Sequence, residues 1–134
     1  MKMKLKKIIV KIYNLKDNKV CNILRLKNFA RYVLEKERFH DLTSVNIIIA
    51  NASYLKELSK KFFKRNKTTN VISFNLGNLG EIYISMDAVV FPEDLYYYLV
   101  HGLLHIVGYD HKTKKAEILM DKKCREYIKK FLSD

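Results

Sequence analysis

The sequence has little cysteine and no long apolar run, and both absences exclude classes of protein. Its two cysteines, Cys21 and Cys124, lie far apart and form no CxxC pair. This argues against a disulfide framework, so no disulfide partner is expected, and against a zinc site made of thiolates. No apolar run approaches the ~20 residues needed to span a bilayer. The apolar stretch after the lysine-rich start, Ile8–Val10, is too short for a signal peptide, which predicts a cytoplasmic protein.

Acidic residues are also scarce relative to basic ones. The chain has 14 Asp and Glu against 26 Lys and Arg, a formal net charge of +12. A balance this basic favours anionic partners such as nucleic acid or a membrane surface. A generally lysine-rich composition would give the same charge without any such partner. The most one-signed stretch lies between Glu57 and Glu81, where no acidic residue occurs.

The 134 residues suffice for one hydrophobic core, and no repeat, low-complexity tract or linker divides them, so residues 1–134 are expected to form a single domain. Apolar periodicity predicts strands at residues 4–13, 43–50, 71–75 and 81–85, and helices at residues 20–36, after Asn51 or Ser53, at 91–107 and after Thr113. This order predicts an α+β fold, a small mixed sheet of about four strands packed with about four to five helices.

Three of the four histidines lie between His101 and His111. On a helix, His101 and His105 lie on the same face. Gly108 is the residue type that ends a helix at positive φ, so the chain can turn back and bring His111 towards the other two. Three neutral imidazoles predict a zinc site, one Zn²⁺ per chain, with the fourth position left for water as in catalytic zinc sites. His40 lies in a charged connection and is left out of this site.

The histidine spacing fits the HExxHxxGxxH pattern of metzincin proteases with one departure. In those enzymes the glutamate after the first histidine is the general base. Gly102 stands in that place and cannot accept a proton. The pattern therefore predicts a zincin-type metal site used for other chemistry, since zinc lowers the pKa of its water to about 7 and polarises a phosphoryl or carbonyl oxygen.

The stretch HGLLHIVGYDH closely resembles the HGxLHLxGYDH signature of the YbeY family, the bacterial metal-dependent endoribonucleases of ribosomal RNA maturation. Thr69–Phe74 resembles the family's T-D/N-V-L-S-F, and Gly80–Ser85 resembles its G-D-I-x-I-S. The order and spacing of the three stretches also agree. The resemblance implies a zincin-like fold and a zinc-dependent, single-strand-specific endoribonuclease. Such an enzyme would act in rRNA processing (16S rRNA 3′-end maturation) and ribosome biogenesis, with RNA and the ribosomal small subunit, rather than a membrane, as partners.

The resemblance also places a strand with Asn70 and Ser73 beside the cleft, where polar groups could position an RNA backbone. A candidate surface for RNA phosphates precedes it, formed by Lys60, Lys61, Lys64, Arg65 and Lys67. The family usually carries an arginine six residues ahead of the Thr-Asp/Asn-Val motif, where this chain has Phe63. Arg65 could take over its role, since a guanidinium can bind phosphate through two hydrogen bonds.

Asp110 is a catalytic candidate beside His101, His105 and His111. Because it precedes His111, it could orient a histidine or transfer a proton. It could equally be a turn residue without a role in chemistry. Tyr109 and Met120, in contrast, are expected to pack in the interior.

Two other functions remain open at this point. A metallopeptidase would need a general base from a position other than 102. A non-catalytic RNA-binding factor of ribosome assembly would use the same basic surface, and its metal would only order the fold.

Overall fold

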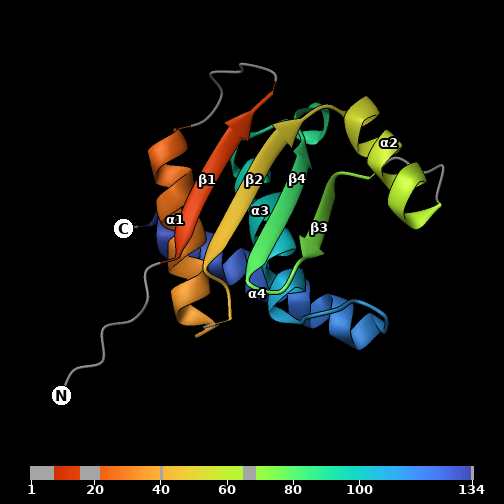
Figure 1. The fold of residues 1–134 in the computed structure, drawn as a ribbon. Helices are drawn as coiled ribbons and strands as arrows, with labels where there is room; N and C mark the ends of the chain where they lie inside the picture. Colours follow the sequence, from red (N-terminus) through yellow and green to blue (C-terminus); the bar gives the residue numbers. More distant parts are fainter. Residues whose placement is uncertain (1–7, 16–21, 40, 65–68, 134) are drawn as a thin grey trace.

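The structure is a computed structural model that describes residues 8–15, 22–39, 41–64 and 69–133. The elements follow the predicted order, with one 3-10 helix added (Figure 1): β1 (Ile9–Asn14), α1 (Ile23–Lys36), β2 (Ser44–Ala50), α2 (Ala52–Phe63), β3 (Val71–Asn75), β4 (Leu79–Ser85), η1 (Met86–Ala88), α3 (Pro92–Val107) and α4 (Lys114–Leu132). The start of the first predicted strand, the predicted helix start at Val20, and Cys21, His40, Arg65 and Lys67 lie outside the described residues.

The strands form one mixed sheet in the order β1-β2-β4-β3. β1, β2 and β4 run parallel to one another, and β3 is antiparallel to β4. β4 begins at Leu79 rather than at the predicted Glu81, because Gly77 (φ +86°) makes a tight turn and donates its N–H to Asn75 Oδ1 at 3.0 Å. The predicted α+β fold with a small mixed sheet is confirmed.

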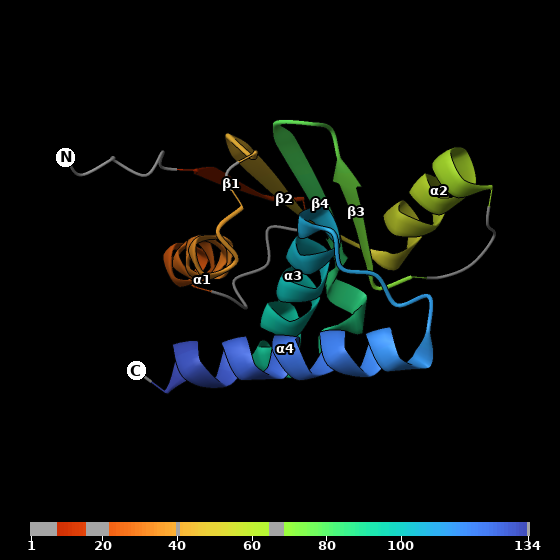
Figure 2. The same cartoon turned by 90° about the horizontal axis from the view of Figure 1, so that it is seen from below.

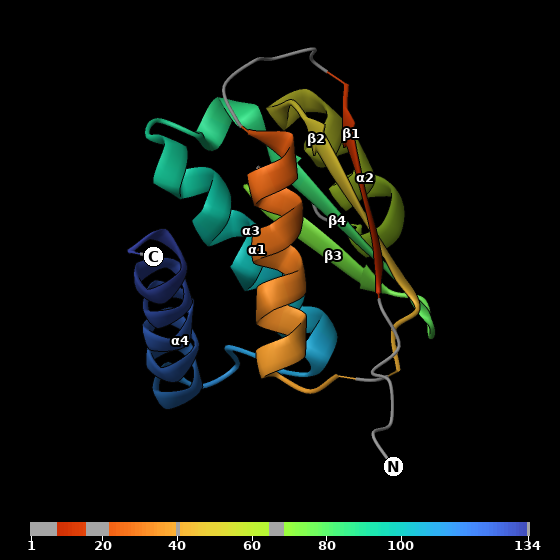
Figure 3. The same cartoon turned by 90° about the vertical axis from the view of Figure 1, so that its left-hand side faces the viewer.

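The main core lies between the sheet and three helices. α1 and α3 cover one face of the sheet, and α4 crosses α3 on the side away from the sheet (Figures 2 and 3). β2 is buried on both faces, as its consecutive isoleucines predict: Ile47, Ile48 and Ile49 are at most 8% exposed. Met120 of α4 is 1% exposed and belongs to this core, which confirms its predicted packing role.

α2 packs on β3 and β4 through a smaller cluster that contains Leu55 and Ile72. Asn51 is the N-cap, and its side chain accepts a hydrogen bond from the Tyr54 N–H at 2.7 Å. The helix ends at Phe63 because Lys64 adopts a left-handed conformation (φ 54°, ψ 32°). This end of α2 contacts β3 through the stacked rings of Phe63 and Phe74.

α3, which carries two of the histidines, has a defined start and end. Pro92 occupies its first turn, and the Asp94 carboxylate accepts hydrogen bonds from the N–H groups of Val90 and Phe91 at 2.9 Å each. These bonds, the Phe91 one first, favour the charged form and lower the pKa of Asp94. At the other end Gly108 has φ +123°, so the helix stops at Val107, as predicted.

Two predictions concern a disulfide and a membrane-spanning segment, neither of which is expected in this chain. Cys124 is a free, buried thiol, and burial raises its pKa to about 12. Among the described helices, none combines the length and the apolarity that crossing a membrane requires.

Candidate metal centre and its pocket

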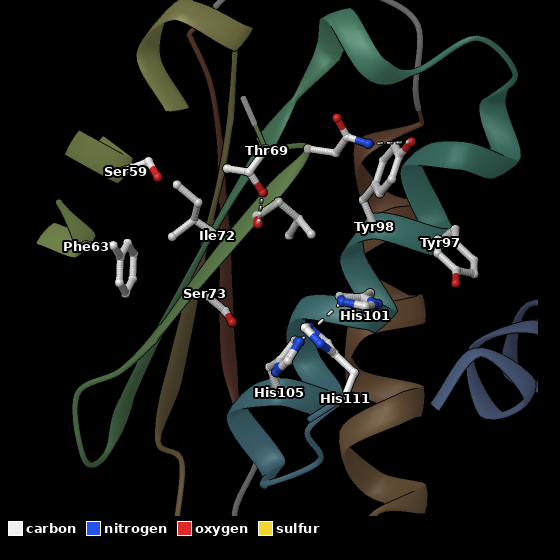
Figure 4. A pocket seen from close by; sticks show the side chains of 12 residues that line it. Ser59, Phe63, Thr69, Ile72, Ser73, Tyr97, Tyr98, His101, His105 and His111 are labelled. Atoms are coloured by element: carbon white, nitrogen blue, oxygen red, sulfur yellow. Dashed lines mark hydrogen bonds between the residues drawn. The ribbon is translucent and has the colours of Figure 1, made fainter. Parts of the chain in front are cut away.

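The three histidines of the predicted metal site meet in space. His101 and His105 come from successive turns of α3, and His111 approaches from the loop that follows (Figure 4). The Nε2 atoms of His101 and His105 are 3.2 Å apart. One ring nitrogen from each histidine lies within 4.8 Å of the others. The spacing therefore produces the predicted convergence.

The loop is positioned by backbone and side-chain contacts around Tyr109. The Tyr109 N–H donates to the Leu104 carbonyl at 2.9 Å, which folds the chain back over the helix end. The Tyr109 ring packs against the main core, and its hydroxyl contacts Lys123 of α4. Its predicted packing role is confirmed. Asp110 is exposed, and its Oδ1 accepts a hydrogen bond from the Lys112 N–H at 3.2 Å, an arrangement typical of turns.

The histidines that α3 contributes are held in the neutral form. Burial, assisted by the nearby His105 and His111, lowers the pKa of His101 to about 4. Burial and then His111 likewise lower the pKa of His105. His101 Nδ1 is buried and has no hydrogen-bond partner among the described residues. Both rings therefore offer a nitrogen lone pair at neutral pH, the state that a metal ligand requires.

This donor set fits a borderline divalent metal. Two nitrogens bound at 2.0–2.1 Å to one tetrahedral zinc would lie roughly 3.4 Å apart, close to the observed 3.2 Å between the two Nε2 atoms of α3. Imidazole ligands suit zinc, copper, iron and nickel better than magnesium or calcium. The site thus has the chemistry of a three-histidine metal centre.

Gly102 is required by packing. A Cβ at this position would lie 2.8 Å from Ile82 Cγ2 and 3.3 Å from Val71 Cγ2. Residue 102 therefore faces β3 and β4, and α3 lies too close to these strands to leave room for a side chain. A glutamate could not serve here as the base of a peptidase without displacing the helix.

The three histidines line one side of a pocket of about 540 Å³ between α3, β3 and the end of α2 (Figure 4). Asn70 and Ser73 line it too, at the place where they were predicted. A second pocket, of about 510 Å³, lies on the α4 side and shares His101 and His111 with the first. The candidate metal centre is therefore accessible from two directions.

The described lysines of the predicted basic run lie on the helix end that borders this pocket, and they do not line it. Lys60, Lys61 and Lys64 are exposed, whereas Ser59 and Phe63 of the same helix end line the pocket. Neither Ser59 nor Phe63 was predicted to belong to the site.

Tyr97 and Tyr98 of α3 line the pocket as well and were not predicted. Tyr97 precedes His101 by one helical turn, so its spacing was a usable signal. Its hydroxyl donates to Asp121 Oδ1 at 2.5 Å. The Tyr98 hydroxyl accepts from Asn70 Nδ2 at 3.3 Å, which joins α3 to the strand edge.

Comparisons with known proteins identify the family to which the chain is similar. The family model of Endoribonuclease YbeY matches residues 11–132. The Endoribonuclease YbeY of Wolbachia sp. subsp. Drosophila simulans (strain wRi) is 36% identical, over 86% of this chain and 91% of that protein. That of Petrotoga mobilis (strain DSM 10674 / SJ95) is 31% identical, over 81% and 84%.

A solved structure shares the fold as well. The solution structure of TM1509 from Thermotoga maritima superposes with a TM-score of 0.63 at 26% identity, over 94% of this chain and 90% of that one. Because the family model covers nearly the whole chain, the chain belongs to the YbeY endoribonuclease family.

Proposed function

We propose that the chain is a zinc-dependent, single-strand-specific endoribonuclease that acts in ribosomal RNA processing, at the 3′ end of 16S rRNA, on the ribosomal small subunit. The observation that carries the proposal is the set of three converging histidines on one side of a pocket lined by the polar edge of β3. Family membership supports RNA as the substrate.

His101, His105 and His111 would hold the metal. A bound zinc supplies Lewis acidity, since it lowers the pKa of water and offsets negative charge on a phosphate. As neutral ligands, the three histidines would leave the charge of a bound metal available to an anionic backbone. Asp110 is exposed next to His111 and is our candidate for proton transfer in this reaction.

The pocket residues would place the RNA strand. Asn70 and Ser73 offer polar groups to the backbone, and the lysines of the α2 end would attract phosphates. Arg65 and Lys67 belong to the same proposed surface by sequence. Because a second pocket continues past His101 and His111 on the α4 side, a strand could enter and leave the site, as internal cleavage requires.

The competing functions fit the structure less well. A peptidase would need a general base, and position 102 is closed by Ile82 and Val71. An assembly factor without catalysis would use the metal only to order the fold. The open pocket beside the three histidines favours catalysis, because a metal that only orders the fold is usually enclosed by its ligands.

The test is cleavage of a labelled single-stranded RNA that spans a precursor ribosomal RNA end. Zinc-loaded, metal-stripped and re-zincated protein are compared with an identically purified His105→Ala variant, whose folding is checked by circular dichroism. We expect cleavage that follows the metal and falls to background in the variant. Equal cleavage by a folded variant would reject the enzyme and favour the assembly factor. A cyclic phosphate on the products would show attack by the ribose 2′-hydroxyl.

A further inference from the structure

We propose that Phe63 is a stacking platform for one unpaired nucleobase of the RNA beside the metal centre. The inference rests on the proposed function and deepens it, because it assigns a substrate-positioning residue that selects single strands.

The position of Phe63 carries the first step. It is the last residue of α2, and its side chain lines the same pocket as the three histidines. Figure 4 shows its ring across the pocket from His105. The residue is 47% exposed, so a large apolar side chain at the pocket remains open to contact with a ligand.

The second step concerns what holds the ring. Phe63 stacks on Phe74 of β3, with centroids 5.8 Å apart and planes only 11° from parallel. The Phe74 ring also makes T-shaped contacts with the rings of Phe62 and Tyr83, at centroid distances of 5.4 Å and 5.8 Å. One face of the Phe63 ring is thus supported from behind by a row of aromatic rings. A base stacking on the pocket side would extend this row with little loss of side-chain freedom.

The third step is the chemistry of the ligand. Every base has an aromatic face, so a stacking site tolerates any sequence. In a duplex both faces of a base are already stacked, and only an unpaired base can be accepted without an unstacking cost. Exposed lysines lie on the same helix end, at positions 60, 61 and 64, where they can attract the phosphates that flank the stacked base.

A packing role alone would also explain an aromatic residue here, and Phe62 separates the two possibilities. Phe62 contacts the same Phe74 ring and is 55% exposed, yet it does not line the pocket. If the rings serve only packing, substitutions at Phe62 and Phe63 should weaken RNA binding to the same extent. If Phe63 stacks on a base, only its substitution should weaken RNA binding.

The experiment compares Phe63→Leu with Phe62→Leu. Binding of a short single-stranded RNA is measured by fluorescence anisotropy on metal-free protein, in which the strand stays intact. From the usual value of a base–aromatic stack we expect about tenfold weaker binding for Phe63→Leu and less than about twofold for Phe62→Leu. Moving one abasic nucleotide along the RNA should reveal a position that costs the wild-type protein a similar factor. The same abasic RNA should cost Phe63→Leu nothing further, because both changes remove one contact.

A variant that keeps the ring protects the test against misfolding. The chain contains no tryptophan, so Phe63→Trp introduces a single fluorophore at the platform. We expect it to bind RNA like the wild type and to be quenched by the stacked base, but not by the RNA that is abasic at the sensitive position. Phe62→Trp should not be quenched.

Each outcome has a defined meaning. Equal losses for the two leucine variants, or an abasic effect that persists in Phe63→Leu, would overturn the platform. Zinc-loaded protein that binds RNA through Phe63 without cleaving it would overturn the proposed function and leave the platform standing. RNA cleavage that does not depend on Phe63 would support the proposed function and overturn the platform.

Discussion

The two walls of the pocket differ in how they are held. The α3 wall carries His101 and His105, half buried on a helix that packs against the sheet without space for a side chain at residue 102. The wall formed by the end of α2 consists of Ser59 and Phe63, with exposed lysines next to it, and it rests on a small satellite cluster. One wall is part of the main core, and the other is close to solvent.

This difference separates two tasks. Metal ligands must be placed within a fraction of an ångström, so they belong on an element whose position is fixed by buried contacts. Groups that guide a polymer can tolerate more freedom, and their identity can change at little cost to stability. The α2 wall also carries Phe63, at the position where the resemblance to the family leads us to expect an arginine.

The largest effect should appear when zinc is added. At a zinc concentration about 100 times its Kd, binding to the folded state alone would stabilise the protein by about 2.7 kcal/mol. We expect a clear rise in the thermal midpoint for the wild type and for Phe63→Leu, and none for His105→Ala. Differential scanning fluorimetry with and without zinc measures this. A Phe63→Leu protein that no longer responds to zinc would mean that the two walls are coupled.

The α3 wall was predictable and the α2 wall only in part, for a physical reason. His101, His105 and Gly108 interact within one helix and its cap, so their spacing along the chain determines their geometry. Asn70 and Ser73 were found because the motif of β3 resembles the family's. Which side chains of α2 face the pocket depends on how that helix lies on β3 and β4. No local sequence pattern determines how α2 is oriented on the sheet. For this reason the lysines were assigned to the site, and Ser59 and Phe63 were not.

The next effect concerns the contacts behind the α3 wall. The side chain of Glu37 is 5% exposed, and it accepts hydrogen bonds from Lys123 at 2.8 Å and from the Tyr127 hydroxyl. It thereby holds the lysine that contacts the Tyr109 hydroxyl. Glu37→Gln should lower the free energy of unfolding by about 2 kcal/mol at pH 7, because bonds to a charged group are lost. Urea denaturation checks this.

The stabilities of the wild type and of Glu37→Gln should also depend differently on pH, and the direction of this difference can be predicted. Burial raises the pKa of Glu37, but hydrogen bonds from Lys123, Tyr127 and Tyr109 outweigh it, so the folded pKa lies below its ordinary value of 4.5. The stabilisation is therefore complete above the unfolded pKa and is lost as pH falls through the folded one. The difference in free energy of unfolding between wild type and Glu37→Gln should become smaller below about pH 4.5. A stability difference that stays constant down to acid pH would show that the charge of Glu37 is not its cause.

A smaller effect tests the close approach of α3 to the sheet. In Gly102→Ala the new Cβ meets Ile82 Cγ2 at 2.8 Å, next to the backbone of a fully buried strand residue. We expect a net loss of about 1 kcal/mol, since overpacking outweighs the better helix propensity of alanine. Gly80→Ala is the comparison variant, because its Cβ would make one close contact, at 2.9 Å, with the movable Cδ1 end of the Ile106 side chain. Equal losses in urea denaturation would argue against a tight contact specific to α3.

The smallest effect on the folded protein, and the sharpest test of the α2 wall, comes from its lysines. Changing Lys60, Lys61 and Lys64 to Gln should leave stability and zinc response unchanged, because all three are exposed. The dependence of RNA binding on salt should become shallower by up to about 2 in log–log slope, at about 0.7 for each lost phosphate contact with a single strand. The control removes the same charge from α4 by changing Lys122, Lys129 and Lys130, which are exposed and line neither pocket that contains the histidines. If both triple variants lower the slope equally, the net charge of the chain, and not a surface beside the pocket, attracts the RNA.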